Sequence, residues 1–144
     1  MPVKTGINPA VTLEALQAMS RNTMVEHLGI EITRIGEMEL EAKMPVDHRT
    51  HQPYGLLHGG ASVALAETLG SVASHCTLHD PNKYCVGLEI NANHLRSVRS
   101  GYVYAVAKPI HLGNRTQVWE IRITNEEKEL VCVSRITMAI VDKR

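Results

Sequence analysis

The stretch Gly55-Leu56-Leu57-His58-Gly59-Gly60-Ala61-Ser62-Val63-Ala64-Leu65-Ala66-Glu67-Thr68-Leu69-Gly70 decides the fold of this chain. A glycine-rich turn leads into a helix that is predicted from His58 to about His79 and is apolar on almost every side. Such a helix lies inside a protein. Glu67 is its only formally charged side chain. A buried carboxylate is costly unless it is paired or has a function, so Glu67 is a candidate catalytic group.

The helix also carries a stripe of small residues around Glu67. Helical spacing aligns Glu67 with Gly60, Ala64, Ser71 and Ser74. Small side chains let a flat ligand, another subunit or a packed sheet come close, and the presence of Glu67 favours a ligand slot or a subunit interface. The structural alternative for Glu67 is an ion pair with an arginine of the sheet.

Strands surround this helix in the sequence. Met38, Leu40, Ala42 and Met44 alternate with charged residues, which predicts a strand with one wet face. After the helix stop at Asp80-Pro81-Asn82, four β-rich runs follow, and the last two are predicted to form a hairpin. Short helices are expected at 12–19, with Thr12 as the cap, and at 22–27. One long helix and five to six antiparallel strands predict an α+β domain that spans residues 1–144. The four runs are 84–94, 101–111, 116–125 and 129–141.

The first of these runs has a distinctive polar face. Strict alternation groups the odd-numbered residues on one side, opposite Val86, Leu88 and Ile90. Because this odd-numbered set includes a glutamate and two asparagines, it is predicted to face solvent or a site. The set is Cys85, Gly87, Glu89, Asn91 and Asn93.

Composition excludes several classes of protein. The 144-residue chain has a formal net charge of zero, which argues against a nucleic-acid-binding face or a basic membrane anchor. No apolar run approaches the length of about 20 residues that spans a membrane. Three cysteines without a zinc or disulfide pattern, and no secretory signal at the start, favour a reducing cytoplasm. His75 and His79 have a spacing that can bind zinc and Cys76 and Asp80 are nearby, but no recognised spacing fixes a third ligand, so no metal is expected.

Several motifs together resemble one known family. The segment 51–60, His-Gln-Pro-Tyr-Gly-Leu-Leu-His-Gly-Gly, and the segment 66–70, Ala-Glu-Thr-Leu-Gly, resemble the hotdog-fold acyl-CoA thioesterases of the phenylacetate-pathway type. Segments 88–96 and 109–113 match the branch that hydrolyses aromatic acyl-CoA thioesters such as 1,4-dihydroxy-2-naphthoyl-CoA, together with its enterobactin-proofreading relatives. The likeness covers almost the whole chain in order and spacing.

The resemblance implies an architecture and an assembly. It implies a hotdog fold, in which a curved antiparallel sheet wraps a long helix, and a homodimer or a tetramer made of two dimers. Active sites would lie between protomers, so that Glu67 of one chain faces Gln52 and His58 of its partner. The substrate would be an acyl-CoA, and no cofactor would be needed.

Catalytic roles follow from the resemblance residue by residue. Glu67 matches the catalytic carboxylate, either as general base or as nucleophile, and the Gly59 N–H matches the oxyanion donor. Gln52 and His58 match the polar pair that orients the thioester carbonyl or the water, although a histidine here is also suited to cap the helix. Ser71 matches a position that either holds water or substrate or serves only in packing.

Basic residues are the candidates for binding the CoA phosphates. His94, Arg96 and Arg99 follow the first β-rich run after the helix, and Arg115 follows the Leu112-Gly113-Asn114 turn. Arginine suits phosphate because its planar fork makes paired hydrogen bonds. A solvated turn is the alternative for each of them.

Two other functions remain compatible with these residues. One is an enoyl-CoA hydratase or dehydratase on the same fold, because His58 and Glu67 also form the kind of pair that those enzymes use. The other is a module that binds acyl-CoA without turnover. Release of free CoA thiol distinguishes hydrolysis from both alternatives.

Overall fold

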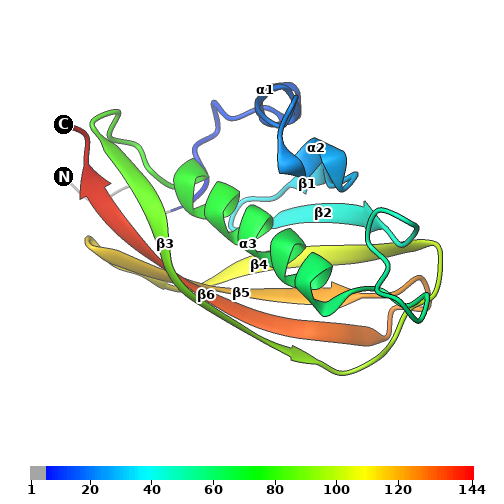
Figure 1. Cartoon of the computed structure of the whole chain (residues 1–144). Helices are drawn as coiled ribbons and strands as arrows, with labels where there is room; N and C mark the ends of the chain where they lie inside the picture. The colour runs from blue at the N-terminus through cyan, green and yellow to red at the C-terminus, as the bar shows by residue number, and fades with distance from the viewer. Residues whose placement is uncertain (1–5) are drawn as a thin grey trace.

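The computed structural model describes residues 6–144 and contains three helices and one sheet (Figure 1). The helices are α1 (Leu13–Met19), α2 (Met24–His27) and α3 (Gly59–Cys76). The strands are β1 (Glu31–Ile35), β2 (Leu40–Pro45), β3 (Lys83–His94), β4 (Tyr102–Leu112), β5 (Thr116–Thr124) and β6 (Leu130–Asp142). The predicted order of elements is confirmed.

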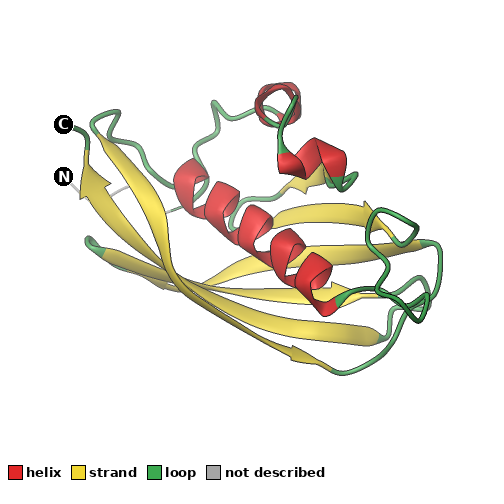
Figure 2. Ribbon diagram, viewed as in Figure 1, coloured by secondary structure: helices red, strands yellow, loops and turns green. Residues whose placement is uncertain are grey.

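The six strands form a single antiparallel sheet in the order β1-β2-β4-β5-β6-β3. The sheet curves around α3, which runs across its inner face, while α1 and α2 lie beside the β1 edge (Figure 2). The predicted hairpin of the last two strands is present, because β5 pairs with β6 over the whole length of β5. The α+β class is confirmed.

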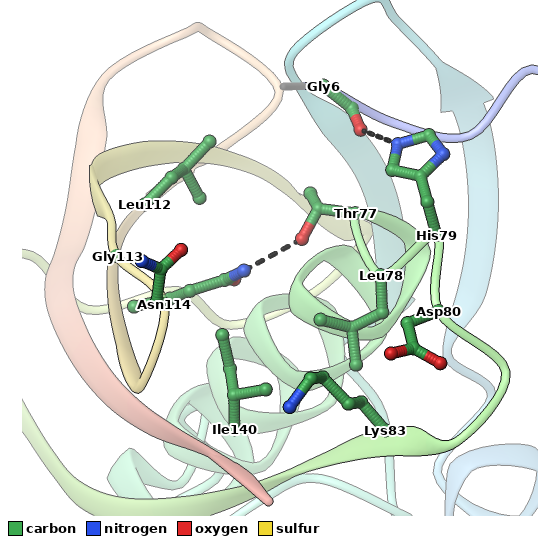
Figure 3. A pocket seen from close by; sticks show the side chains of 11 residues that line it. Gly6, Thr77, Leu78, His79, Asp80, Lys83, Leu112, Gly113, Asn114 and Ile140 are labelled. Carbon is green, nitrogen blue, oxygen red and sulfur yellow. Dashed lines mark hydrogen bonds between the residues drawn. The ribbon is translucent and has the colours of Figure 1, made fainter. Parts of the chain in front are cut away.

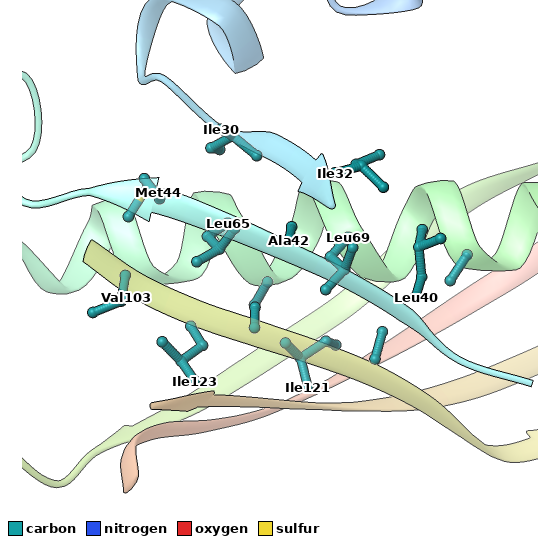
Figure 4. Packing of buried hydrophobic residues seen from close by; sticks show 14 of the residues in the cluster. Ile30, Ile32, Leu40, Ala42, Met44, Leu65, Leu69, Val103, Ile121 and Ile123 are labelled. Atoms are coloured by element: carbon teal, nitrogen blue, oxygen red, sulfur yellow. The ribbon is translucent and has the colours of Figure 1, made fainter. Parts of the chain in front are cut away.

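The core lies between α3 and the inner face of the sheet (Figure 4). Leu65 and Leu69 of α3 are fully buried against the central strands, which contribute Ile121 and Ile123. The predicted inner face of β2 is also buried, from Leu40 to Met44. Burial of a large aliphatic side chain contributes about 1.5–3 kcal/mol, so this layer holds α3 in place over the sheet.

Local sequence signals set the helix ends. The Thr12 hydroxyl accepts from the Ala15 N–H at 3.2 Å and caps α1 as predicted. Helix α3 ends at Cys76 rather than at His79. It ends early because the Thr77 hydroxyl donates to the Ser74 carbonyl at 2.7 Å and terminates the last turn. His79 therefore lies beyond the helix, and the helical zinc spacing with His75 is not realised.

The predicted polar face of β3 is right for Glu89, Asn91 and Asn93, but Cys85 and Gly87 do not share it, because a β-bulge interrupts the strand. Gly87 pairs with Met138 and Glu89 pairs with Thr137, which leaves Leu88 without a partner on β6. An extra residue reverses the alternation of all later side chains. Cys85 and Gly87 face α3, and after the bulge Ile90 and Ala92 pack on the core. Glu89 and the two asparagines are exposed on the other side.

Strand β3 forms an edge of the sheet. It pairs with β6 and has no second neighbour within residues 6–144. Its exposed apolar side chains are Tyr84, Val86 and Leu88. No helix in the described part of the chain is both long enough and apolar enough to cross a membrane.

Candidate active site

At the beginning of α3, one backbone amide has no acceptor among the described residues. The first N–H groups of a helix have no partner within the helix. Here the Gly60 N–H donates to His58 Nδ1 at 2.7 Å, and the Ala61 and Ser62 N–H groups donate to the His58 carbonyl at 2.9 and 3.2 Å. Only the Gly59 N–H donates to no group within residues 6–144. This amide also lies at the positive end of the helix dipole, where it can stabilise a negative charge.

Two side chains next to this amide have fixed orientations. His58 caps α3, so the structural role considered for it is real. Because its Nδ1 accepts the Gly60 N–H, the neutral ring carries its proton on Nε2, where it can donate to a ligand. The Gln52 side-chain oxygen accepts the Tyr54 N–H, which leaves the Gln52 amide NH₂ group free to donate.

A cleft of about 440 Å³ opens at the start of α3. Gln52, Gly59 and Ser62 line it on the loop and helix side, and His94 and Arg96 line it at the end of β3 and just beyond. The His94 ring lies directly over the helix start, because a methyl group built on Gly59 would meet His94 Nε2 at 3.1 Å. His58 lines a smaller hollow of about 240 Å³ beside the cleft, with Arg49 and Ala64.

Glu67 lies on the same helix but against β3. Its side chain is half-buried, and a methyl group built on Gly87 would lie 2.8 Å from its Oε1. No arginine or lysine among residues 6–144 lies within ion-pair distance of its carboxylate. The alternative of a structural ion pair with an arginine is therefore not realised within the described chain.

Gly59 and Glu67 of one chain are too far apart to act on one carbonyl group. They are eight residues apart on α3, and a rise of 1.5 Å per residue separates them by about 12 Å along the axis. Glu67 does not line the cleft that contains Gln52 and Gly59. Within a single protomer, the predicted oxyanion donor Gly59 and the predicted catalytic carboxylate of Glu67 thus lie in separate places.

Ser71 lies one turn beyond Glu67 and is directed toward the sheet. Its hydroxyl donates to the Met138 sulfur at 3.8 Å, which is a weak contact. Its carbonyl accepts from the Cys85 thiol at 3.9 Å. Within one chain these contacts are those of a small packing residue.

The predicted basic residues are divided between two ends of the molecule. Arg96 is half-exposed in the cleft and forms an ion pair with Glu129 at 3.2 Å. The Arg99 carbonyl accepts from His51 Nε2 at 2.8 Å, which ties the loop before α3 to the loop after β3. Arg115 follows the β4–β5 turn, and its carbonyl accepts from the Ile140 N–H near the far end of β6. Arg115 does not join the other basic residues within one protomer.

A second cavity, of about 470 Å³, lies at the C-terminal end of α3 (Figure 3). None of the predicted site residues lines it. At its base a buried polar network joins Gln117 to three partners: its oxygen accepts from Ser74 at 2.7 Å and from Trp119 at 2.8 Å, and its NH₂ donates to Thr77 at 2.8 Å. Sequence reasoning missed this network, because Gln117 and Ser74 are 43 residues apart.

The cysteines have the properties of core residues. Cys76 and Cys132 are buried, and burial raises the pKa of the Cys76 thiol to about 11. Burial also raises the pKa of Cys85 and Cys132. Within residues 6–144, no group of three or more His, Cys, Asp or Glu side chains is arranged to hold a metal ion.

Comparison with known proteins identifies the family. The thioesterase superfamily profile matches residues 54–132. The chain is 57% identical over 131 residues to the 1,4-dihydroxy-2-naphthoyl-CoA hydrolase of Escherichia coli, covering 91% of this chain and 96% of that protein. It is 56% identical over 131 residues to the proofreading thioesterase EntH of Cronobacter turicensis, covering 91% and 95%. The crystal structure of a Haemophilus influenzae thioesterase superposes with a TM-score of 0.91 at 56% identity, covering 94% of each chain.

The chain therefore belongs to the thioesterase superfamily. The resemblance seen in the sequence is confirmed, including the hotdog fold and the branch to which the motifs pointed. The protein is a thioester hydrolase by its family. These similarities identify the family and not the roles of individual residues.

Proposed function

We propose that this protein hydrolyses acyl-CoA thioesters to a free acid and CoA, with Glu67, Gly59, Gln52 and His58 as its reacting and orienting groups. The observation that carries the proposal is the unpaired Gly59 N–H at the start of α3, in the same cleft as the free NH₂ group of Gln52. Hydrogen-bond donors that line one cleft are suited to hold the oxygen of a thioester carbonyl.

The chemistry follows from these donors and one carboxylate. In one route Glu67 takes a proton from water, and the resulting hydroxide adds to the thioester carbonyl carbon. In the other route the Glu67 carboxylate adds to that carbon itself, and water later hydrolyses the anhydride. In both routes the carbonyl oxygen becomes negative and is stabilised by the Gly59 N–H, and the C–S bond then breaks to release the CoA thiolate. Loss of one such donor typically lowers the rate by about 10²–10³.

A productive site on this proposal needs two copies of the chain. The separation of about 12 Å between Gly59 and Glu67 along α3 is too long for one thioester carbonyl. The long free edge of β3, with exposed Tyr84 and Leu88, is suited to pair with a second β3. Antiparallel pairing there extends the sheet and places the two α3 helices side by side in opposite directions. Glu67 of one copy then faces the helix start of the other, in a homodimer or in a dimer of dimers.

The CoA nucleotide would lie at the mouth of the cleft, where His94 and Arg96 are exposed and where Arg99 follows in the next loop. Because the chain has a formal net charge of zero, binding of the CoA phosphates depends on this local group of basic side chains. Aromatic acyl groups are the proposed substrates, because the E. coli relative is a hydrolase of 1,4-dihydroxy-2-naphthoyl-CoA. The neutral chain without a membrane-spanning helix among its described residues suits a cytoplasmic substrate of this kind.

A thioester panel with the variant Glu67→Gln tests the proposal. Release of free CoA thiol from benzoyl-CoA and naphthoyl-CoA is followed with a thiol reagent. We expect Glu67→Gln to lose at least about 10³ in kcat at unchanged melting temperature. The matched control is Glu37→Gln in an exposed turn, which should keep full activity. Full turnover by Glu67→Gln, or hydration of an enoyl thioester without CoA release, would overturn the proposal.

A further inference from the structure

We propose that Gly87 is a positioning residue that holds the Glu67 carboxylate for attack, an inference that rests on the proposed function of Glu67. The Gly87 Cα faces the carboxylate at the point where α3 crosses β3. A methyl group built there would lie 2.8 Å from Oε1 and 3.9 Å from Oε2 of Glu67. The first of these distances is shorter than van der Waals contact, so any larger residue at 87 must displace the carboxylate.

The bulge beside Gly87 isolates this slot from other charges. If Leu88 paired regularly with β6 instead of forming the bulge, strict alternation would place Glu89 on the α3 side, next to Gly87 on that face. Two carboxylates side by side there would repel each other. In the observed register Glu89 is instead exposed and accepts from the Asn91 side chain at 3.0 Å. Gly87 is thus the last residue before the bulge to face α3, and the Glu67 carboxylate beside it has no second carboxylate from β3 next to it.

The effect of a side chain at 87 differs from ordinary overpacking. Gly87 has no positive φ, so alanine fits its backbone without strain. The atom that must move is the end of a flexible side chain, which can swing away at little cost in stability. By contrast, a methyl group at Gly70 would meet Ile136 Cγ2 at 2.6 Å in the packed core. Gly87→Ala is therefore expected to misplace the carboxylate without unfolding the protein.

The test compares Gly87→Ala with Gly36→Ala in the full-length protein. Gly36 is the control for adding a methyl group beside a glutamate away from the site, because a methyl group there would lie 2.7 Å from Glu39 Cγ in the β1–β2 turn. We expect Gly87→Ala to lower kcat about 10- to 100-fold, with KM within about threefold, melting temperature and elution volume unchanged. Gly36→Ala should keep the wild-type kcat and KM.

A double-mutant cycle with Glu67→Asp separates positioning from packing. Aspartate withdraws the carboxylate by one methylene, about 1.5 Å, and makes room for the new methyl group. In that background Gly87→Ala should change kcat less than about threefold. An equal loss in both backgrounds, a loss of kcat matched by a fall in melting temperature, or full activity of Gly87→Ala would each overturn the assignment. Glu67→Gln is measured alongside: if it stays active, the proposed function fails, whereas an inactive Glu67→Gln with an active Gly87→Ala refutes only the role of Gly87.

Discussion

Mixing two inactive variants should restore a defined fraction of the activity. Within one chain Gly59 and Glu67 lie about 12 Å apart along α3, so on the proposed arrangement each active site takes Glu67 from one copy and Gln52 from the other. The perturbations are Glu67→Gln and Gln52→Ala. Each variant alone damages every site. A dimer with one copy of each holds one site with both groups intact and one site with neither.

The expected magnitude follows from random pairing. If equal amounts of the two variants are unfolded together and refolded, about half of the dimers are mixed, and half of the sites in those dimers are intact. The mixture should therefore regain about a quarter of the wild-type rate of CoA release. Refolded wild-type protein, which should recover full activity, is the control for the procedure. A mixture no more active than the average of the two variants would refute the reasoning, because both groups would then come from one chain.

Three further outcomes follow from the buried and paired groups. Gln117→Leu leaves the fully buried Trp119 N–H without an acceptor, so urea unfolding should show a loss of about 2–4 kcal/mol; a loss below about 0.5 kcal/mol would contradict the role of the network. Hydrogen bonds from Arg49 lower the pKa of Asp47 to about 2, below its unfolded value near 3.9. In melting curves, Asp47→Asn should therefore be less stable than the wild type above about pH 4, and this difference should vanish toward pH 2. A difference that persists at pH 2 would argue against this pair. Since the pKa of Cys76 is raised to about 11, only about 10⁻³ of the Cys76 side chain is thiolate at pH 8. A thiol-alkylating reagent should therefore modify Cys76 at least about 100-fold more slowly in native protein than in unfolded protein, as mass spectrometry can measure.

The sequence predicted those features that depend on local periodicity and composition. The apolar run after Gly59 indicated the buried helix, and the alternation from Leu40 to Met44 indicated the inner face of β2. The Thr12 cap was also predicted, because a cap needs only residues within one turn. Glu67 stood out because it is a lone charge on an apolar helix, and the resemblance of the flanking motifs to a known family added its proposed role.

The tertiary structure decided what depends on contacts between distant segments. The bulge at Leu88 could not be predicted from alternation, because a bulge exists only in the pairing with β6. The contact between Glu67 and Gly87, the placement of the His94 ring over Gly59 and the Gln117 network all join segments that are distant in the chain. Sequence thus determined which candidate reactive groups the chain carries, since chemistry resides in side chains. Only the folded sheet decided which backbone segment lies against each of these groups, since strand register and sheet curvature set the distances between them.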